Sequence, residues 1–395
     1  MVAGVEIHGE VASGFEKVGD AFATNFANHG EVGAAFSLYV KGQKVVDVWG
    51  GLADQESGRE WAEDSLQLVF STTKGATAAC AHLLAQRGDL DLEAPVSEFW
   101  PEFAAEGKGD IPVRWLLCHK SGLPTVDPAL SPEQVLAWQP IVEALAAQHP
   151  YWEPGTAHGY HALTYGWLVG EVIKRVDGRS IGRFFNDEIA EPLGLDFWIG
   201  LPEAEEHRVT TLLQLAGIGD AGGLPDIDIE SLPENVREMI RAYTDPESLT
   251  QRALIVSRPA MDYNTREVHA AEIPAANGIC TARSLAKMYA SFVGEVDGVR
   301  ILDEVTVKDA TVEQSNGPDR VLQIPTRFGS GFFLPSSFSP LFGPSSFGHA
   351  GAGGSLGMAD VDAEIGFGYV MNKMQQNLSG DPRTTSLIEA VKASL

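Results

Sequence analysis

The order of strand-like and helix-like segments along the chain is the feature that most limits its fold. Near the amino terminus, apolar residues at helical spacing predict a helix over 12–29, and alternating apolar positions predict a hairpin over 34–48. The carboxyl-terminal part has short, apolar, glycine-punctuated segments and ends in a predicted helix at 384–394. Its strands are predicted at 327–334, 345–350, 355–361 and 365–372.

The middle of the chain, from about residue 85 to 270, has a different character. Helical segments alternate there with loops marked by proline and glycine, and helices are predicted at 134–148 and 163–175. The acidic stretch 202–250 is interpreted as loops around short helices.

These patterns favour an α+β fold. The simplest packing joins the strands of both chain ends in one antiparallel sheet, flanked by the two terminal helices. We therefore predict a sheet domain from residues 1–84 and 270–395 and a mostly helical inserted domain from residues 85–269. A groove between two domains is a usual place for a small-molecule site, so the active site is predicted there.

Charge and cysteine content exclude several classes of function. The chain has 28 Lys and Arg against 54 Asp and Glu, and a net charge of −26 disfavours nucleic acid and anionic lipid as partners. No apolar run is long enough to span a membrane and the first residues do not resemble a signal peptide, so a cytoplasmic location is expected. Three widely separated cysteines predict neither a disulfide framework nor a zinc site, and no cofactor is predicted.

Ser71 and Lys74 form the main candidate for a reactive pair. The apolar run 66–70 leads into Ser71-Thr-Thr-Lys74, and an alanine-rich helix follows as far as Leu84. Residues three apart on a helix share a face, so the Lys74 amine can reach the Ser71 hydroxyl. A lysine in a dry groove loses part of its preference for the charged form and can act as a base.

Two other serines compete with Ser71. Ser284 and Lys287 repeat the S-x-x-K spacing, but there Thr281 looks like a helix N-cap and Lys287 like a solvated residue. Ser355 lies in a G-x-S-x-G sequence, but the predicted segment after it is a strand, and no histidine follows it as the nucleophile elbow requires.

Metal and phosphate sites have little support. His158 and His161 are close in sequence, but no Cys or carboxylate cluster accompanies them, and no metal site is predicted. The glycine-rich run 351–357 lacks the Gly-Lys-Ser/Thr ending of a phosphate loop.

Four stretches in the same order resemble the serine beta-lactamase and penicillin-binding protein superfamily. They are Ser71–Lys74, Leu116–Pro124, Trp152–Tyr160 and Phe347–Gly351, and the likeness runs from about residue 30 to 372. The second stretch is similar to a turn of the class C branch, and the chain as a whole looks most like the family VIII carboxylesterases.

Departures from the superfamily pattern bear on the substrate. The tyrosine element is Tyr160-His161-Ala162, without the usual Asn, and His349 stands where beta-lactamases carry Lys. The resemblance implies that, in beta-lactamases, this Asn and this Lys help to hold the amide and the carboxylate of a beta-lactam. Their loss favours a serine carboxylesterase for small, neutral, short-chain esters, with a small-molecule ester as its partner. An amide-directed hydrolase of this superfamily and a catalytically silent binding protein remain alternatives.

The resemblance also implies the roles of the site residues. Ser71 would attack the ester and form an acyl-enzyme, and Lys74 and Tyr160 would form the base system for both half-reactions. Tyr160 would need a lowered pKa, supplied by a cationic Lys74, and Tyr165 competes with it for the role. The resemblance also places the oxyanion between the N–H groups of Ser71 and Ala352. In the stretch Phe347–Gly351, Gly351 would let the backbone approach the substrate, and His349 would line the pocket.

Overall fold

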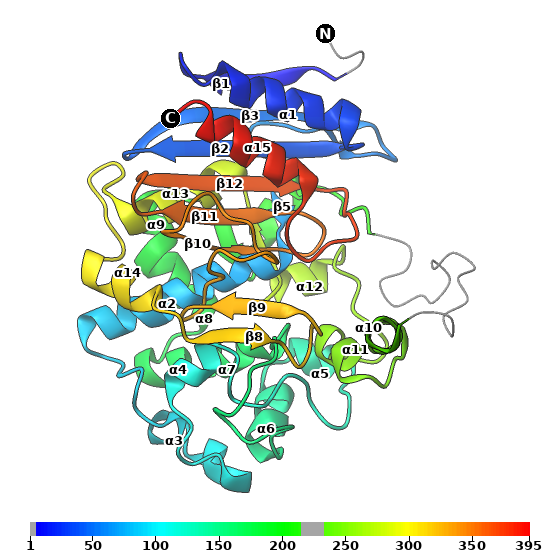
Figure 1. Cartoon of the computed structure of the whole chain (residues 1–395), viewed down its shortest axis with the longest axis vertical. Helices are drawn as coiled ribbons and strands as arrows, with labels where there is room; N and C mark the ends of the chain where they lie inside the picture. The colour runs from blue at the N-terminus through cyan, green and yellow to red at the C-terminus, as the bar shows by residue number, and fades with distance from the viewer. Residues whose placement is uncertain (1–4, 215–232) are drawn as a thin grey trace.

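A computed structural model describes residues 5–214 and 233–395 (Figure 1). Its main sheet is antiparallel and joins the two ends of the chain, in the order β1-β3-β2-β12-β11-β10, with β4 paired to the end of β3. The junction between the chain ends is the β2–β12 ladder, where Phe36 is paired with Tyr369. The strands are β1 (Ile7–Val11), β2 (Gly33–Val40), β3 (Gln43–Asp54), β4 (Arg59–Glu60), β10 (Ser346–Ala350), β11 (Leu356–Asp360) and β12 (Ile365–Met371).

Helices cover both faces of this sheet. The terminal helices α1 (Glu16–Asn28) and α15 (Pro382–Lys392) pack on each other and on one face (Figure 1), where Phe22, Phe36, Phe367 and Leu387 share one apolar cluster. The other face is covered by α13 (Ala282–Val293), which contacts β2, β11 and β12. The predicted α+β fold with terminal helices on the sheet is thereby confirmed.

The rest of the chain is mostly helical, with two small sheets. The order β5-β7-β6 gives a three-stranded sheet of β5 (Gln67–Leu68), β6 (Phe197–Ile199) and β7 (Gly278–Cys280), and β8 (Ser315–Pro318) pairs with β9 (Pro325–Phe328) in a hairpin. The remaining α-helices are α2 (Thr73–Arg87), α3 (Val96–Phe99), α4 (Val113–Leu117), α5 (Pro132–Leu136), α6 (Gln139–Ala147), α7 (Thr164–Asp177), α8 (Ile181–Phe185), α9 (Glu191–Leu193), α10 (Glu234–Thr244), α11 (Leu249–Leu254), α12 (Arg266–Ala270) and α14 (Glu304–Ala310).

Some predicted elements differ from the structure. The predicted helix 134–148 is two helices, because Trp138 adopts a positive φ of 66° between α5 and α6. The predicted strand 327–334 is a strand only at its start, in β9 of the β8–β9 hairpin, while Phe333 near its end makes an isolated antiparallel bridge to Gly348 of β10 in the main sheet. The strand β1, which precedes the first helix, was not predicted.

Part of the interpreted loop region 202–250, namely 215–232, lies outside the described residues. The division into a sheet domain and a helical domain stays a proposal. Within the part of the chain that the structure describes, no helix combines the length and the apolar character needed to cross a membrane.

Candidate active site

Ser71 stands at a sharp turn between strand and helix. After β5 the chain enters the short 3-10 helix η1 (Phe70–Thr72), and Phe70, directly before Ser71, has a positive φ of 46° that is costly for a bulky residue. Thr73 holds this turn, because its hydroxyl donates to the Phe70 carbonyl at 2.6 Å and accepts the Gly278 N–H at 2.8 Å. The strain and the two hydrogen bonds fix Ser71 at the start of α2.

Lys74 lies one turn along from Ser71 and is completely buried. Its Nζ is 3.0 Å from Ser71 Oγ, 2.7 Å from the Ala162 carbonyl and 3.0 Å from the Ala275 carbonyl. The two carbonyls only accept hydrogen bonds, so they use two N–H groups of the amine and leave its third position facing the Ser71 hydroxyl. The predicted contact between the two side chains is therefore present.

Burial holds the pKa of Lys74 well below its usual value. No carboxylate within the described residues forms an ion pair with Lys74, so only the two carbonyls and the Ser71 hydroxyl offset the loss of hydration of an ammonium group, and burial dominates. This environment favours the neutral amine, which is the form that can accept a proton.

Tyr160 lies on the other side of Ser71. Its ring centroid is 4.8 Å from Lys74 Nζ, and its hydroxyl hydrogen-bonds with the Ser71 side chain. Burial raises the pKa of Tyr160, and the hydrogen bond to Ser71 offsets this only in part. The expectation of a lowered tyrosine pKa was therefore wrong, because burial of the phenol outweighs the hydrogen bond to Ser71.

Tyr165, the competing tyrosine, lies farther away. Its ring centroid is 5.7 Å from Lys74 Nζ, and its buried hydroxyl has no hydrogen-bond partner among the described residues. The geometry therefore favours Tyr160 as the phenol that acts on Ser71.

Asp319 fixes the backbone at Tyr160. This carboxylate is 2% exposed, and its Oδ1 accepts the N–H groups of Tyr160 at 3.0 Å, Val321 at 2.8 Å and Leu322 at 2.9 Å. Its Oδ2 accepts the Thr326 hydroxyl at 3.0 Å. Sequence reasoning missed Asp319, since an acidic residue beside Pro318 in a loop is ordinarily a solvated turn residue.

The turn that contains His119 also supports Tyr160. The Gly159 N–H donates to the His119 carbonyl at 3.1 Å, and the His161 N–H donates to His119 Nδ1 at 3.1 Å. His161 in turn contacts the Ser121 hydroxyl at 2.9 Å and accepts the Leu123 N–H at 3.0 Å. These contacts join two of the stretches that carried the family resemblance.

Two backbone N–H groups are free to hold an oxyanion. Within the described residues, the N–H groups of Ser71 and Ala352 donate to no protein acceptor, and both residues line one cavity. Gly351 makes their approach possible, because a Cβ there would lie 2.1 Å from the Val69 carbonyl oxygen. Its role is thus to bring β10 against the nucleophile turn, which differs from the predicted approach to the substrate.

His349 is placed differently from the prediction. It is 1% exposed and lies behind Tyr160 and Phe333, with ring-centroid distances of 6.1 Å and 4.4 Å. It is not among the described residues that line the cavity. Its pKa is held well below the usual value, mainly by burial, so it is a neutral packing partner of the cavity wall.

The competing motifs are structural. Ser284 Oγ accepts the Asp196 N–H at 2.8 Å, and Lys287 donates to the Leu193 carbonyl. Ser355 donates to the Val69 carbonyl at 2.8 Å and is followed by β11, so it is not a nucleophile elbow. In the described ranges no group of three or more His, Cys, Asp or Glu residues could hold a metal ion.

The cavity above Ser71 has a volume of about 190 Å³. None of its described lining residues is charged, and Ser71, Tyr160, Gln214 and Tyr263 supply its polar side chains. The apolar wall is built by Phe70, Leu163, Leu254, Ile255, Met261, Leu322, Phe333, Phe338, Met374 and Leu378. This lining suits a neutral and largely apolar molecule.

Comparisons with known proteins relate the whole chain to characterised relatives. The family model described as Beta-lactamase matches residues 18–392. Esterase/beta-lactamase LipL of Mycobacterium tuberculosis is 36% identical over 94% of this chain and 84% of its own length. The crystal structure of a family VIII carboxylesterase is 38% identical, with a TM-score of 0.86 over 99% of this chain and 100% of that one. A penicillin-binding protein homolog from Caulobacter crescentus is 36% identical, with a TM-score of 0.85 over 99% and 100%.

Proposed function

Since the chain belongs to the beta-lactamase family, we propose that it is a serine carboxylesterase that forms an acyl-enzyme on Ser71. The observation that carries this proposal is a buried Lys74, unpaired with any described carboxylate, at 3.0 Å from Ser71 Oγ beneath an uncharged cavity. The resemblance to named esterases supports the same reaction.

In acylation, neutral Lys74 acts as the general base. Ser71 donates its proton to Nζ and its Oγ attacks the ester carbonyl, while the N–H groups of Ser71 and Ala352 stabilise the oxyanion. Tyr160, whose pKa is raised by burial, stays protonated and donates its hydroxyl proton to the departing alcohol as Lys74 returns a proton to it.

In deacylation, the same pair works on water. A water molecule gives its proton to neutral Lys74 as it attacks the Ser71 ester, Tyr160 protonates Ser71 Oγ as that oxygen leaves, and Lys74 returns a proton to Tyr160. Among the described residues that line the cavity there is no carboxylate or histidine that would serve as a separate base.

The cavity supports a small, neutral ester as the substrate. A carboxylate on the substrate would be buried without a cation, which costs several kcal/mol. Amide hydrolysis on the same scaffold is the second candidate, favoured by the likeness to a penicillin-binding protein homolog. Rates on p-nitrophenyl butyrate, nitrocefin and a D-amino acid amide, compared at equal enzyme, separate the two.

The test is a fluorophosphonate probe combined with serine substitutions. Ser71→Ala should abolish hydrolysis of p-nitrophenyl acetate and butyrate, and a peptide map should place the probe on Ser71. Ser284→Ala, in the other S-x-x-K sequence, is the matched control and should keep most of the activity. An adduct on Ser284 or Ser355 would reject the assignment, and a folded protein that takes no label would favour a silent binding protein.

A further inference from the structure

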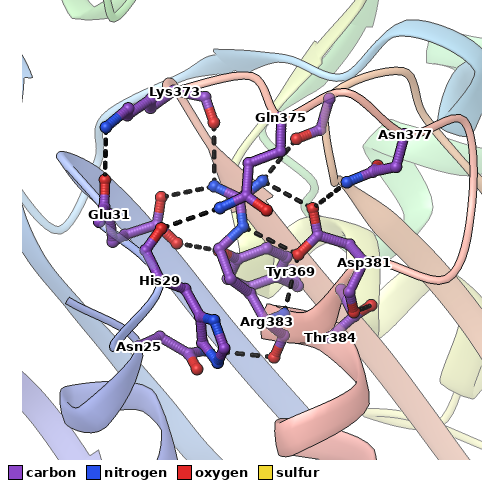
Figure 2. A network of polar contacts seen from close by, with 12 residues as sticks. Asn25, His29, Glu31, Tyr369, Lys373, Gln375, Asn377, Asp381, Arg383 and Thr384 are labelled. Carbon is purple, nitrogen blue, oxygen red and sulfur yellow. Dashed lines mark hydrogen bonds and ion pairs between the residues drawn. The ribbon is translucent and has the colours of Figure 1, made fainter. Parts of the chain in front are cut away.

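The largest buried ionic network of the described residues centres on Arg383, in the first turn of α15 (Figure 2). Its side chain is fully buried, yet all five guanidinium N–H groups have acceptors. Nε donates to Asp381 Oδ1 at 2.9 Å, Nη1 to Glu31 and the Lys373 carbonyl at 2.9 Å each, and Nη2 to Asp381 Oδ2 at 2.8 Å and the Gly353 carbonyl at 2.5 Å.

These contacts tie together segments that are far apart in sequence. Glu31 precedes β2, Lys373 follows β12, and Gly353 follows β10, so one guanidinium joins three strand ends of the main sheet to α15. Tyr369 of β12 completes the network, because its hydroxyl donates to Glu31 Oε2 (Figure 2).

The loop that Arg383 holds carries the proposed oxyanion donor. Gly353 is the residue after Ala352, and its N–H donates to the Asn377 carbonyl at 3.1 Å while its carbonyl also accepts the Gln375 N–H at 3.0 Å. The side-chain amide of Asn377 in turn donates a hydrogen bond to Asp381 Oδ2 at 2.7 Å. The conformation of Gly353 is therefore fixed on both sides by the segment that Arg383 anchors.

Space around the loop is also set by Arg383. Gly354 has a φ of 132°, and a Cβ there would lie 2.3 Å from Arg383 Nη2. A Cβ on Gly353 would lie 2.6 Å from Met374 Cγ. Met374 lines the cavity and is the next residue after Lys373, whose carbonyl accepts a hydrogen bond from Arg383. The glycines at positions 353 and 354 are thus explained by their close packing on Met374 and on the Arg383 guanidinium.

We propose that Arg383 is a positioning residue for ester hydrolysis, which holds the loop 351–355 so that the Ala352 N–H points at the oxyanion. The proposal rests on the proposed function, since it needs Ser71 as nucleophile and Ala352 as donor. Arg383 is not among the described residues that line the cavity, so it would not contact the substrate. It acts by holding the backbone carbonyls of Gly353 and Lys373.

The variant Arg383→Lys tests this role. An ammonium group has three donors and no planar fork, so it cannot hold Glu31, Asp381 and both carbonyls together. Loss of one oxyanion donor costs about 10² to 10³ in rate, and a displaced donor should cost less. We expect kcat for p-nitrophenyl butyrate to fall about 10- to 100-fold per active site, with KM changed less than threefold.

A second variant changes the Arg383 network less and keeps the test valid if Arg383→Lys does not fold. Asp381→Asn keeps the N-cap of α15, because Asn caps as well as Asp, but its amide nitrogen opposes the guanidinium. It should lower kcat in the same sense and to a smaller extent. Arg179→Lys is the matched control: Arg179 likewise forms several ion pairs, with Asp177, Asp187 and Glu188, but it does not contact the loop 351–355.

Active sites are counted by complete phosphonate labelling of each variant, and thermal midpoints are measured beside the rates. Lower kcat per labelled site in Arg383→Lys and Asp381→Asn, but not in Arg179→Lys, supports the inference. Variants that lose thermal stability and keep kcat per labelled site overturn it, because Arg383 would then be structural only. If wild-type protein takes no label at Ser71, the proposed function fails and this inference fails with it.

Discussion

Single residues decide the chemistry here through their protonation states. Lys74 is surrounded by two carbonyls and one hydroxyl, and burial holds its pKa well below the usual value. In the proposed mechanism the lowered pKa of Lys74 and the raised pKa of Tyr160 favour Lys74 as the base and Tyr160 as the acid, the opposite of a tyrosinate base beside an ammonium group.

Replacing Lys74 by Arg tests that assignment at this scale. A guanidinium stays protonated at every accessible pH, so kcat/KM for p-nitrophenyl butyrate should fall about 10² to 10⁴-fold. In the wild type, kcat/KM should rise with pH as Lys74 loses its proton, and that limb should reach its plateau well below the pH expected for an exposed lysine.

The matched control for this variant is Lys108→Arg. Lys108 is also fully buried and donates to three backbone carbonyls, those of Ala105, Ala146 and Gln148, but it lines no part of the cavity. It should lower stability and leave the pH–rate profile in place. A Lys74→Arg enzyme with near wild-type rates would argue against Lys74 as the base.

Secondary-structure elements contribute by bringing distant loops to the nucleophile. The S-x-x-K pair lies on η1 and α2, but Tyr160 lies in a loop before α7, and that loop is held by Asp319 from the β8–β9 hairpin. The three N–H groups bound by Asp319 include that of Leu322, which lines the cavity, so one carboxylate sets both the phenol and part of the wall.

Asp319→Ala should therefore lower both stability and activity. Three buried N–H groups would lose their acceptor, at about 1–3 kcal/mol each, so a loss of at least about 3 kcal/mol is expected. Asp319→Asn keeps an acceptor oxygen and should be milder in kcat and in urea unfolding. Asp303→Ala removes only the N-cap of α14, about 1 kcal/mol, and should not change kcat; equal effects of the two alanine variants on kcat would refute the role of Asp319.

At the scale of the whole molecule, the Arg383 network links folding to pH. One guanidinium faces two carboxylates, Glu31 and Asp381, with the Tyr369 hydroxyl beside Glu31, and all are nearly or fully buried. If both carboxylates are charged, the network buries a net negative charge, and burial raises the pKa of Glu31 from 4.5 to about 7.

The sign of the pH dependence follows from that shift. Between about pH 4.5 and 7 the folded protein keeps a proton on Glu31 that the unfolded chain has lost, so this contribution to stability is present at low pH and is lost as the pH rises through about 7. Its full size is on the order of 3 kcal/mol.

Glu31→Gln, a neutral replacement, should therefore gain stability relative to wild type between pH 5 and pH 8. Urea midpoints at intervals of one pH unit measure this difference. A constant difference across that range would show that Glu31 does not titrate in it.

The sequence by itself determined the local parts of this protein. The three-residue spacing of Ser71 and Lys74, the apolar alternation in β2 and the short apolar runs of β10, β11 and β12 are patterns that the chain carries at short range. The tertiary structure alone decided which groups are charged and which backbone donors are free. The carbonyls of Ala162 and Ala275 and the carboxylate of Asp319 reach the site from distant segments, and only packing removes the water that would otherwise hold the pKa of Lys74 at its usual value.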